Sequence, residues 1–274
     1  MNIKNIGIAG LGLIGGSFAR AFYEQGLNIY GFDKDEKVLI AANATEIFEC
    51  LTDKIEDFLL FDLDLIYICL PVMDGLELIR YFGEKRVKIP LTDALSTKLS
   101  ISKLSKKYEL NFCGGHPIGG REKSGFKHSD INILKGVCHI LTGPKGQLFD
   151  ALWQLHESIG MKLIYMDPSM HDEIFGIVSH LPHLIAFSLV ETVSKVNEDA
   201  LDYAGAGFKD FTRIAGSSDI MWSNIFLDNR DNLLLLIDNY VDNLKSWRDL
   251  INKSKIKDLR EKISKVSNKR RILK

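Results

Sequence analysis

Short apolar runs alternate with amphipathic stretches through the first part of the chain. Seven apolar runs have the length and composition of buried strands: 6–9, 28–32, 63–70, 89–92, 110–113, 137–141 and 162–166. Between them lie five stretches with helical periodicity: 13–25, 36–43, 73–84, 100–108 and 145–158. This alternation predicts an α/β fold with a mostly parallel sheet and helices on both of its faces.

The pattern changes after Asp167-Pro168. From 170 to about 251 nearly every position fits a helix, including the long run 219–250, and the strand-like alternation stops. We therefore expect a sheet domain over 1–167 and an all-helical domain over 168–274. The tail 251–274 has ten Lys/Arg and two acids, which predicts a solvated terminal helix or a frayed end. The alternative is a basic arm that contacts a partner or nucleic acid.

Composition narrows the class of protein. Hydrophobic residues make up 46% and charged residues 26%, and the formal net charge is −1, which indicates neither a nucleic-acid nor a membrane partner. No uninterrupted apolar run approaches the roughly 18 residues of a spanning helix, and nothing resembles a signal peptide. The four cysteines, at 50, 69, 113 and 138, form no pair and no metal-ligand spacing. These features predict a protein of the reducing cytoplasm.

A glycine motif, G-x-G-x-x-G, occupies 10–15, between a predicted strand and a predicted helix, and an acid follows at the end of the second strand. In this context the motif predicts a dinucleotide site, with the diphosphate at the helix N-terminus and the acid on the adenosine ribose. A carboxylate there repels a 2′-phosphate, which favours NAD over NADP. The residues expected at the cofactor are Gly10, Gly12, Leu13, Ile14, Gly15 and Asp33, with Leu70 and Pro71 after the central apolar strand.

The segment 116–125 has a composition that packing seldom requires: a histidine, a proline, three glycines, three charges and a serine. It follows a short strand-like run, and polar loops at strand ends are where α/β enzymes place reactive groups. Together with the dinucleotide motif upstream, this segment predicts a redox enzyme in which His116 is the general base.

Three further polar clusters lie at 92–98, at 171–183 and at 205–215. His180 and His183 are three residues apart and share a helix face. A continuous α-helix would place His171 on the opposite side from His180. No H-E-x-x-H or cysteine pair accompanies these histidines, so we expect no metal site.

These motifs, taken in order, resemble the prephenate/arogenate dehydrogenase family of tyrosine biosynthesis. The resemblance spans about 3–230. It rests on the following segments: G-L-G-L-I-G-G-S at 10–17, T-D-x-x-S-x-K at 92–98, H-P-I-G-G-R-E-K-S-G at 116–125, H-D at 171–172, S-H-L-P-H at 179–183 and G-F-K-D-F-T-R-I-A at 207–215 with Met221-Trp222. Gly119 and Arg121 replace the alanine and threonine usual in the family's loop.

The resemblance implies oxidative decarboxylation of prephenate by NAD to 4-hydroxyphenylpyruvate. It implies that His116 is the base, that Ser96 bonds the reacting hydroxyl and orients His116, and that Arg213 binds a substrate carboxylate. It further implies substrate contacts from His183 and His180 and a gating ion pair from Glu122.

Several alternatives remain open at this level. Arogenate could replace prephenate, because the two differ only in an amino or keto side chain. Another NAD(P)-dependent reductase with a helical dimerisation domain, or a non-catalytic NAD-sensing scaffold, would share the glycine motif. Apolar stripes such as 233–237 exceed what a small sheet domain needs for cover. We therefore expect the helical domain to form a homodimer interface, and Trp222 to be a core or interface residue or a pocket contact.

Overall fold

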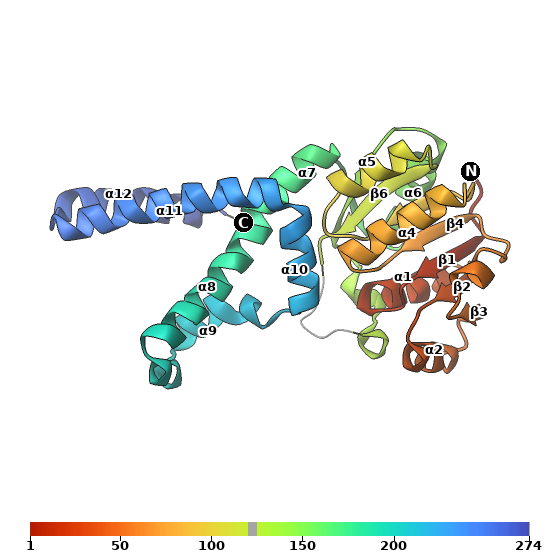
Figure 1. Ribbon diagram of the computed structural model, residues 1–274, viewed down its shortest axis with the longest axis horizontal. Helices are drawn as coiled ribbons and strands as arrows, with labels where there is room; N and C mark the ends of the chain where they lie inside the picture. Colours follow the sequence, from red (N-terminus) through yellow and green to blue (C-terminus); the bar gives the residue numbers. More distant parts are fainter. Residues whose placement is uncertain (120–124, 274) are drawn as a thin grey trace. The chain divides into compact units, whose positions relative to one another are not determined.

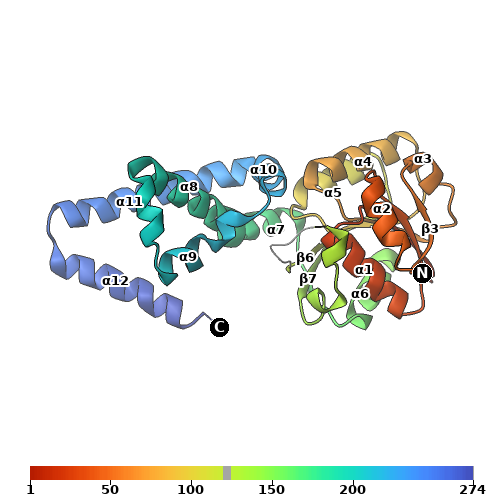
Figure 2. The same cartoon turned by 90° about the horizontal axis from the view of Figure 1, so that it is seen from below.

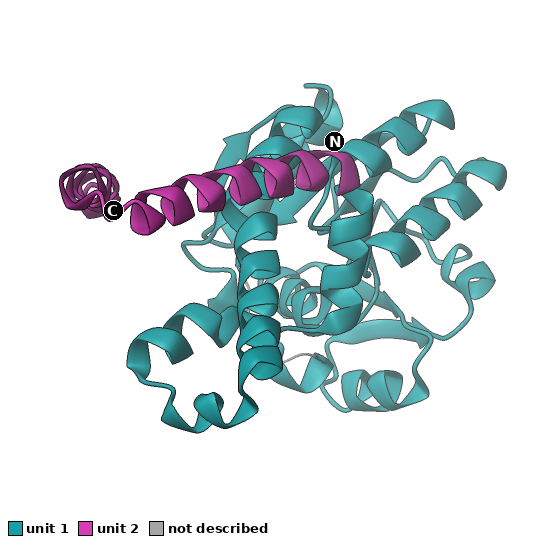
Figure 3. Cartoon of the chain, turned by 60° about the vertical axis from the view of Figure 1, so that its left-hand side comes forward, with its two compact units in different colours: residues 1–229 teal, residues 230–274 magenta. Residues whose placement is uncertain are grey.

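The computed structural model describes residues 1–119 and 125–273. The chain separates into two compact units, Met1–Asn229 and Arg230–Lys274 (Figure 3). The boundary predicted near residue 167 lies inside the first of these units and stays a prediction.

An eight-stranded sheet forms the centre of the first unit, in the order β3-β2-β1-β4-β5-β6-β7-β8 (Figure 1). All neighbouring strands are parallel except β6 and β7. The fold class predicted from the alternation is therefore confirmed. The strands are β1 (Asn5–Ala9), β2 (Asn28–Phe32), β3 (Phe48–Thr52), β4 (Leu65–Ile68), β5 (Leu91–Asp93), β6 (Phe112–Pro117), β7 (Cys138–Thr142) and β8 (Lys162–Tyr165).

Helices cover both faces of the sheet, as Figure 2 shows most clearly. One buried cluster packs α1 and α6 against the strands, and a second packs α3, α4 and α5 against the opposite face. The helices of this part are α1 (Leu13–Glu24), α2 (Glu36–Asn43), α3 (Ile55–Phe58), α4 (Val72–Glu84), α5 (Leu99–Lys107) and α6 (Gln147–Ser158), with short 3₁₀ turns at Phe126–His128 (η1) and Ile131–Ile133 (η2).

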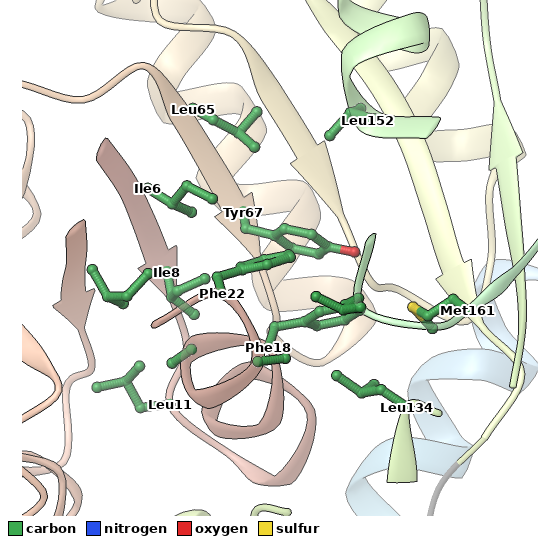
Figure 4. Close-up of a cluster of buried hydrophobic side chains, with 14 of the residues drawn as sticks. Ile6, Ile8, Leu11, Phe18, Phe22, Leu65, Tyr67, Leu134, Leu152 and Met161 are labelled. Carbon is green, nitrogen blue, oxygen red and sulfur yellow. The ribbon is translucent and has the colours of Figure 1, made fainter. Parts of the chain in front are cut away.

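The first cluster has an aromatic centre (Figure 4). Phe18 stacks on Tyr67 with ring centroids 4.6 Å apart and on Phe22 at 5.5 Å. The Tyr67 hydroxyl lies 2.9 Å from Nε2 of the buried His156. Burying three aromatic rings beside the glycine loop holds α1 rigidly against β1 and β4.

A long helical run, Pro168–Val196, follows the sheet and contains a π-helical turn. It consists of α7 (Pro168–Phe175), the turn η3 (Gly176–His180) and α8 (Leu181–Val196). Pro182 explains the turn, because a proline inside a helix lacks an N–H and its ring clashes with the carbonyl four residues earlier. The wider turn relieves that clash, and π-turns occur mostly at functional sites.

The rest of the helical part comprises η4 (Glu198–Tyr203), α9 (Ala206–Thr212), η5 (Arg213–Gly216) and α10 (Asp219–Asp228) in the first unit. The second unit contains α11 (Arg230–Asn252) and α12 (Ile256–Arg271). There Nζ of Lys262 lies 2.8 Å from Oγ of Ser246 and 4.5 Å from the ring centre of Trp247, so the two helices pack together. The basic tail is therefore largely helical, and none of the residues of α12 is buried.

Some expectations about the elements were wrong. Strand β3 and the short α3 were missed, because the edge strand carries a mixed polar and apolar sequence with no clear period. The helical run 219–250 is two helices that separate at Asn229. His116 lies within β6 rather than in a loop, because the antiparallel strand β7 pairs with this strand as far as Pro117.

By length and composition alone, Pro168–Val196 could cross a membrane, and only 17% of its most apolar window is buried. Its first half, however, carries His171, Asp172 and His180, all buried within the first unit. In α8, only Ala186 is buried. The first half of this helical run thus carries buried polar residues, whereas most of the apolar side chains of α8 are half-buried in the part of the chain that the structure describes.

Candidate active site

A chain of hydrogen bonds links three side chains at the end of β6. Nδ1 of His116 lies 2.8 Å from Nε2 of His171, and Nδ1 of His171 lies 2.8 Å from Oδ1 of Asp172. His116 is half-buried, whereas His171 and Asp172 are almost fully buried. The structure therefore joins the histidine of the 116–125 segment to the H-D pair of the helical part.

The positions of the protons follow from Asp172. A carboxylate only accepts, so Nδ1 of His171 carries a hydrogen and its Nε2 accepts one. The hydrogen between the two rings therefore belongs to Nδ1 of His116. In the neutral state, Nε2 of His116 keeps a lone pair, which a general base requires.

Asp172 is itself held by the N-terminus of α5. Its two carboxylate oxygens accept hydrogen bonds from the backbone N–H groups of Lys98, at 2.8 Å, and of Leu99, at 2.9 Å. An anion at this end of a helix is favoured by the unpaired N–H groups and the helix dipole. A residue of α7 thus caps helix α5, which follows strand β5.

Beneath His116 lies a buried ion pair between Lys98 and Asp93, both fully inaccessible to solvent. Nζ of Lys98 also donates to the carbonyl oxygen of Gly115 at 2.6 Å, and Oδ1 of Asp93 accepts from the Gly115 N–H at 2.9 Å. The pair therefore holds both sides of the residue before His116. Burial raises the pKa of Asp93 and lowers that of Lys98, and their contact opposes both shifts.

The surroundings keep the histidines neutral. Burial, followed by the nearby His171, Lys98 and His180, lowers the pKa of His116 well below its ordinary value. Burial also lowers the pKa of His171, against the opposing hydrogen bond from Asp172. Neutral rings at physiological pH are consistent with the proton positions derived from Asp172.

Two more histidines lie beside Trp222 of α10. The His183 ring stacks on Trp222 with centroids 3.5 Å apart, and the His180 ring meets it edge-on at 6.1 Å. Both rings contact one indole, as their three-residue spacing predicts. Trp222 is buried, and its Nε1 has no hydrogen-bond partner in the part of the chain that the structure describes.

A continuous α-helix would have placed His171 and His180 on opposite sides, but the π-turn Gly176–His180 interrupts the α-helical spacing between them. The side-chain amide of Asn229 lies 2.8 Å from the Asp172 carbonyl oxygen and 2.9 Å from Nδ1 of His180.

The remaining predicted substrate residues are less closely joined. Arg213 is exposed at the start of η5, and its charge lowers the pKa of His183, after the larger effect of burial. Ser96 is half-buried in the loop between β5 and α5 and makes no hydrogen bond to His116 among the described residues. Glu122 and Arg121 lie outside the described residues. The described part of the chain contains no cluster of three metal-ligating side chains.

The glycine loop has the geometry that a dinucleotide needs. Gly10 has φ +94°, and a Cβ there would lie 2.5 Å from the Cys69 carbonyl oxygen. A Cβ on Gly15 would lie 1.9 Å from the Gly10 oxygen, so α1 packs directly on the turn. At Gly12 a Cβ would meet no atom within 4 Å, and this N-cap makes no side-chain hydrogen bond. The space beside Gly12 at the N-terminus of α1 is therefore open, which a diphosphate bound there would require.

Asp33 lies at this loop and braces it. Its Oδ2 accepts from the Leu11 N–H at 2.8 Å, and its Oδ1 accepts from the Asp35 N–H at 2.9 Å. Leu70 is also adjacent, because its Cδ2 would lie 2.7 Å from a Cβ on Gly10. Pro71 occupies the N-cap position of α4, next in the chain. The structure thus brings together the predicted cofactor residues from three separate segments.

Sequence reasoning missed several residues of the site. Asp93 and Lys98 lie within the motif at 92–98, but no role was predicted for them. The available signal was a lysine five residues after an acid at the end of a strand, which can form a buried ion pair. Asn229 carried no signal, because an asparagine in a polar helical stretch is ordinary. Its importance depends on a contact with residues 57 and 49 positions away.

Known proteins resemble this chain along most of its length. Residues 18–165 match the family model of the prephenate dehydrogenase nucleotide-binding domain, and 167–265 match that of the prephenate dehydrogenase dimerization domain. The prephenate dehydrogenase of Lactococcus lactis subsp. cremoris is 32% identical over 253 residues, covering 88% of this chain and 70% of the relative. The cyclohexadienyl dehydrogenase of Zymomonas mobilis is 31% identical over 260 residues, covering 90% and 88%.

A solved structure is also similar to this chain over almost its whole length. The prephenate dehydrogenase from Aquifex aeolicus, in complex with hydroxyphenyl propionate and NAD⁺, superposes with a TM-score of 0.90 at 34% identity and covers 98% of each chain. Family models, relatives and structure agree on the family and with the fold. The chain therefore belongs to the prephenate dehydrogenase family of dehydrogenases.

Proposed function

We propose that this protein catalyses the NAD-dependent oxidative decarboxylation of prephenate to 4-hydroxyphenylpyruvate, CO₂ and NADH. The observation that carries the proposal is the His116–His171–Asp172 chain, which presents an unprotonated Nε2 at the end of β6. It is supported by membership of the family and by the Aquifex aeolicus relative, whose structure contains NAD⁺ and hydroxyphenyl propionate.

The cofactor site fits NAD. We assign the diphosphate to the turn formed by Gly10, Gly12, Leu13, Ile14 and Gly15, whose open side faces the N-terminus of α1. Asp33 accepts the adenosine ribose hydroxyls, and its charge disfavours a 2′-phosphate. Leu70 and Pro71 line the adjacent strand end. When bound, NAD⁺ accepts the hydride from the ring carbon that carries the substrate hydroxyl.

His116 supplies the proton transfer. Its Nε2 takes the proton of the ring hydroxyl while the C–H bond of that carbon breaks, and the C–O bond gains double-bond character. When the ring carboxylate leaves as CO₂, its C–C electron pair enters the ring, and the oxygen can take the proton back from His116. Asp172 stabilises the transient imidazolium through His171. General base assistance of this kind contributes about 10²–10⁴-fold in rate.

Substrate charge is bound on the helical side. We assign a carboxylate of prephenate to the Arg213 guanidinium, which can form two parallel hydrogen bonds with it. His183 and His180 contact the substrate next to Trp222. Ser96 donates to the reacting hydroxyl and orients it toward His116, and Glu122 pairs with a basic group at the entrance.

We further propose a cytoplasmic homodimer with a domain boundary near residue 167. The apolar side chains of α8 are mostly half-buried, only Ala186 is buried, and Ile177 and Val178 before them are exposed, which favours a protein partner. The family model that matches 167–265 is named for dimerization. A second copy of the chain would cover these side chains. A membrane is disfavoured as the partner, because α7, in the same helical run, carries polar residues that are buried inside the first unit.

One assay set tests the activity. Formation of NADH or NADPH is followed by the absorbance of the reduced nicotinamide at about 340 nm. Prephenate and arogenate are each tested with NAD and with NADP. We expect turnover with prephenate and NAD, and a much larger KM with NADP. Preference for arogenate would reassign the substrate, and no turnover with either compound would refute the proposal.

A further inference from the structure

Asn229 makes two hydrogen bonds with a single nitrogen. This residue follows α10 and is 4% exposed. Its Nδ2 lies 2.8 Å from the backbone oxygen of Asp172 and 2.9 Å from Nδ1 of His180. A primary amide has two N–H hydrogens, one for each of these partners.

The carbonyl of Asp172 decides the orientation of the amide. That oxygen can only accept, so the atom facing it must be Nδ2, because the reversed amide would place two acceptors against each other. The second amide hydrogen then points to Nδ1 of His180. This ring nitrogen must accept, and the ring hydrogen must lie on Nε2.

We propose that Asn229 is a positioning residue that holds His180 as a neutral ring with its hydrogen on Nε2, so that His180 donates a hydrogen bond to a substrate oxygen. This inference rests on the proposed function for the substrate itself, but the tautomer does not. Nε2 lies on the opposite side of the ring from Asn229. Among the described residues no hydrogen bond to this nitrogen is seen, although the residue as a whole is 2% exposed.

The charged groups around His180 agree with a neutral ring. Burial is the largest effect and lowers the pKa of His180 to about 4, while Asp172 on α7 opposes this shift. His171 on α7 and His183 on α8 lower it further. The uncharged Asn229 and Trp222 contact the ring from α10. An imidazolium would also have to place a hydrogen on Nδ1, against the amide hydrogen of Asn229.

Asp172 links the two histidines that have opposite roles. Its carboxylate makes His171 an acceptor for His116, so Nε2 of His116 keeps a lone pair. Its carbonyl accepts from Asn229, which in turn makes Nδ1 of His180 an acceptor. Asp172 thereby sets both the nitrogen that takes a proton, Nε2 of His116, and the nitrogen that donates a hydrogen bond, Nε2 of His180.

The tautomer can be measured directly. Protein labelled with ¹⁵N-histidine is examined by two-bond ¹H–¹⁵N correlation spectra across neutral pH, and the His180 signals are assigned by their loss in His180→Gln. We expect the Nε2–H form in the unaltered protein. The Nδ1–H form or an imidazolium would overturn the proposal, whether or not the Asn229 variants fold.

Variants of Asn229 test the cause and the consequence. Asn229→Asp replaces the donor with an acceptor and should move the hydrogen to Nδ1 or charge the ring, while Asn229→Leu removes both hydrogen bonds. The control Asn239→Asp adds the same charge on an exposed position of α11. An unchanged tautomer in both Asn229 variants would overturn the positioning role.

Kinetics then separate the donor role from the proposed reaction. Losing one substrate hydrogen bond should raise KM for prephenate about tenfold in Asn229→Asp, with a smaller change in kcat and no change in Asn239→Asp. An unchanged KM in a variant with the altered tautomer would remove the donor role. If the unaltered protein does not oxidise prephenate, the proposed function fails, and the spectra still decide the tautomer.

Discussion

Nε2 of His171 lies 2.8 Å from Nδ1 of His116, and this contact joins strand β6 to helix α7. The far side of His171 is held by Asp172. The tautomer of the proposed base is therefore set by a carboxylate that does not touch it. This arrangement makes the following outcomes measurable.

His116→Asn should leave NAD binding nearly unchanged and lower kcat by about 10²–10⁴-fold. The amide of asparagine can still donate to His171, but it has no basic nitrogen. Fluorescence titration with NAD and steady-state kinetics with prephenate measure the two quantities. Turnover comparable to that of the unaltered protein would refute the assignment of the base.

Asp172→Asn should weaken the chain at its far end. The neutral amide keeps one acceptor oxygen, so it cannot accept from Lys98, Leu99 and His171 together, and it no longer stabilises a His116 imidazolium through His171. We expect kcat to fall about 10²-fold or more, as when the aspartate of a catalytic triad is replaced by asparagine. Asp167→Asn, at the exposed N-cap of α7, is the matched control and should have normal kcat.

Arg213→Ala should raise KM for prephenate about 10–100-fold with a smaller effect on kcat, because a hydrogen bond to a charged group contributes about 1.5–3 kcal/mol. Arg213→Lys should recover only part of the loss, since an ammonium cannot form the bidentate pair. A wild-type KM in Arg213→Ala would mean that the carboxylate binds elsewhere.

Lys98→Met should destabilise the fold by about 3–5 kcal/mol, because it leaves the Asp93 carboxylate buried without its cation. The double variant Lys98→Met with Asp93→Asn should lose less than the single variant does, since no unpaired charge remains. Urea unfolding curves measure both free energies. Additive losses from the two single substitutions would contradict a coupled ion pair.

His156 makes stability depend on pH. Burial lowers its pKa from 6.5 to about 4. Between these pH values His156 therefore binds a proton in the unfolded chain but not in the folded protein. This contribution, about 3 kcal/mol, is fully present above pH 6.5 and is lost as the pH falls from 6.5 toward about 4. Urea unfolding at several pH values should show a shallower dependence in His156→Gln than in the exposed control His128→Gln. Equal slopes would contradict this origin.

Much of the fold could be predicted because its signals are local. Buried parallel strands are short apolar runs, and the helices between them carry one apolar face, so α2 and β2 were predicted with the bounds that they have. The dinucleotide turn was equally predictable. Its requirements at Gly10 and Gly15 are steric limits within a few residues of chain.

Other parts of the fold depend on partners far along the chain. Strand β6 continues through His116 only because β7 returns antiparallel beside it, and no local pattern announces that direction. The π-turn at Gly176–His180 combines the effect of Pro182 with packing on α10. The sequence therefore indicated that His180 and His183 share a face, but not that a π-turn separates them from His171.

By itself, the sequence determined the α/β class, the glycine turn, Asp33 and the candidate base His116, because periodicity, steric limits and residue chemistry are readable position by position. Only the tertiary structure decided how the histidines are protonated. His116 depends on a ring 55 residues away, and His180 depends on an amide 49 residues away. The direction of a hydrogen bond is a property of the pair and its neighbours, and those pairs exist only once the sheet and the helices have packed together.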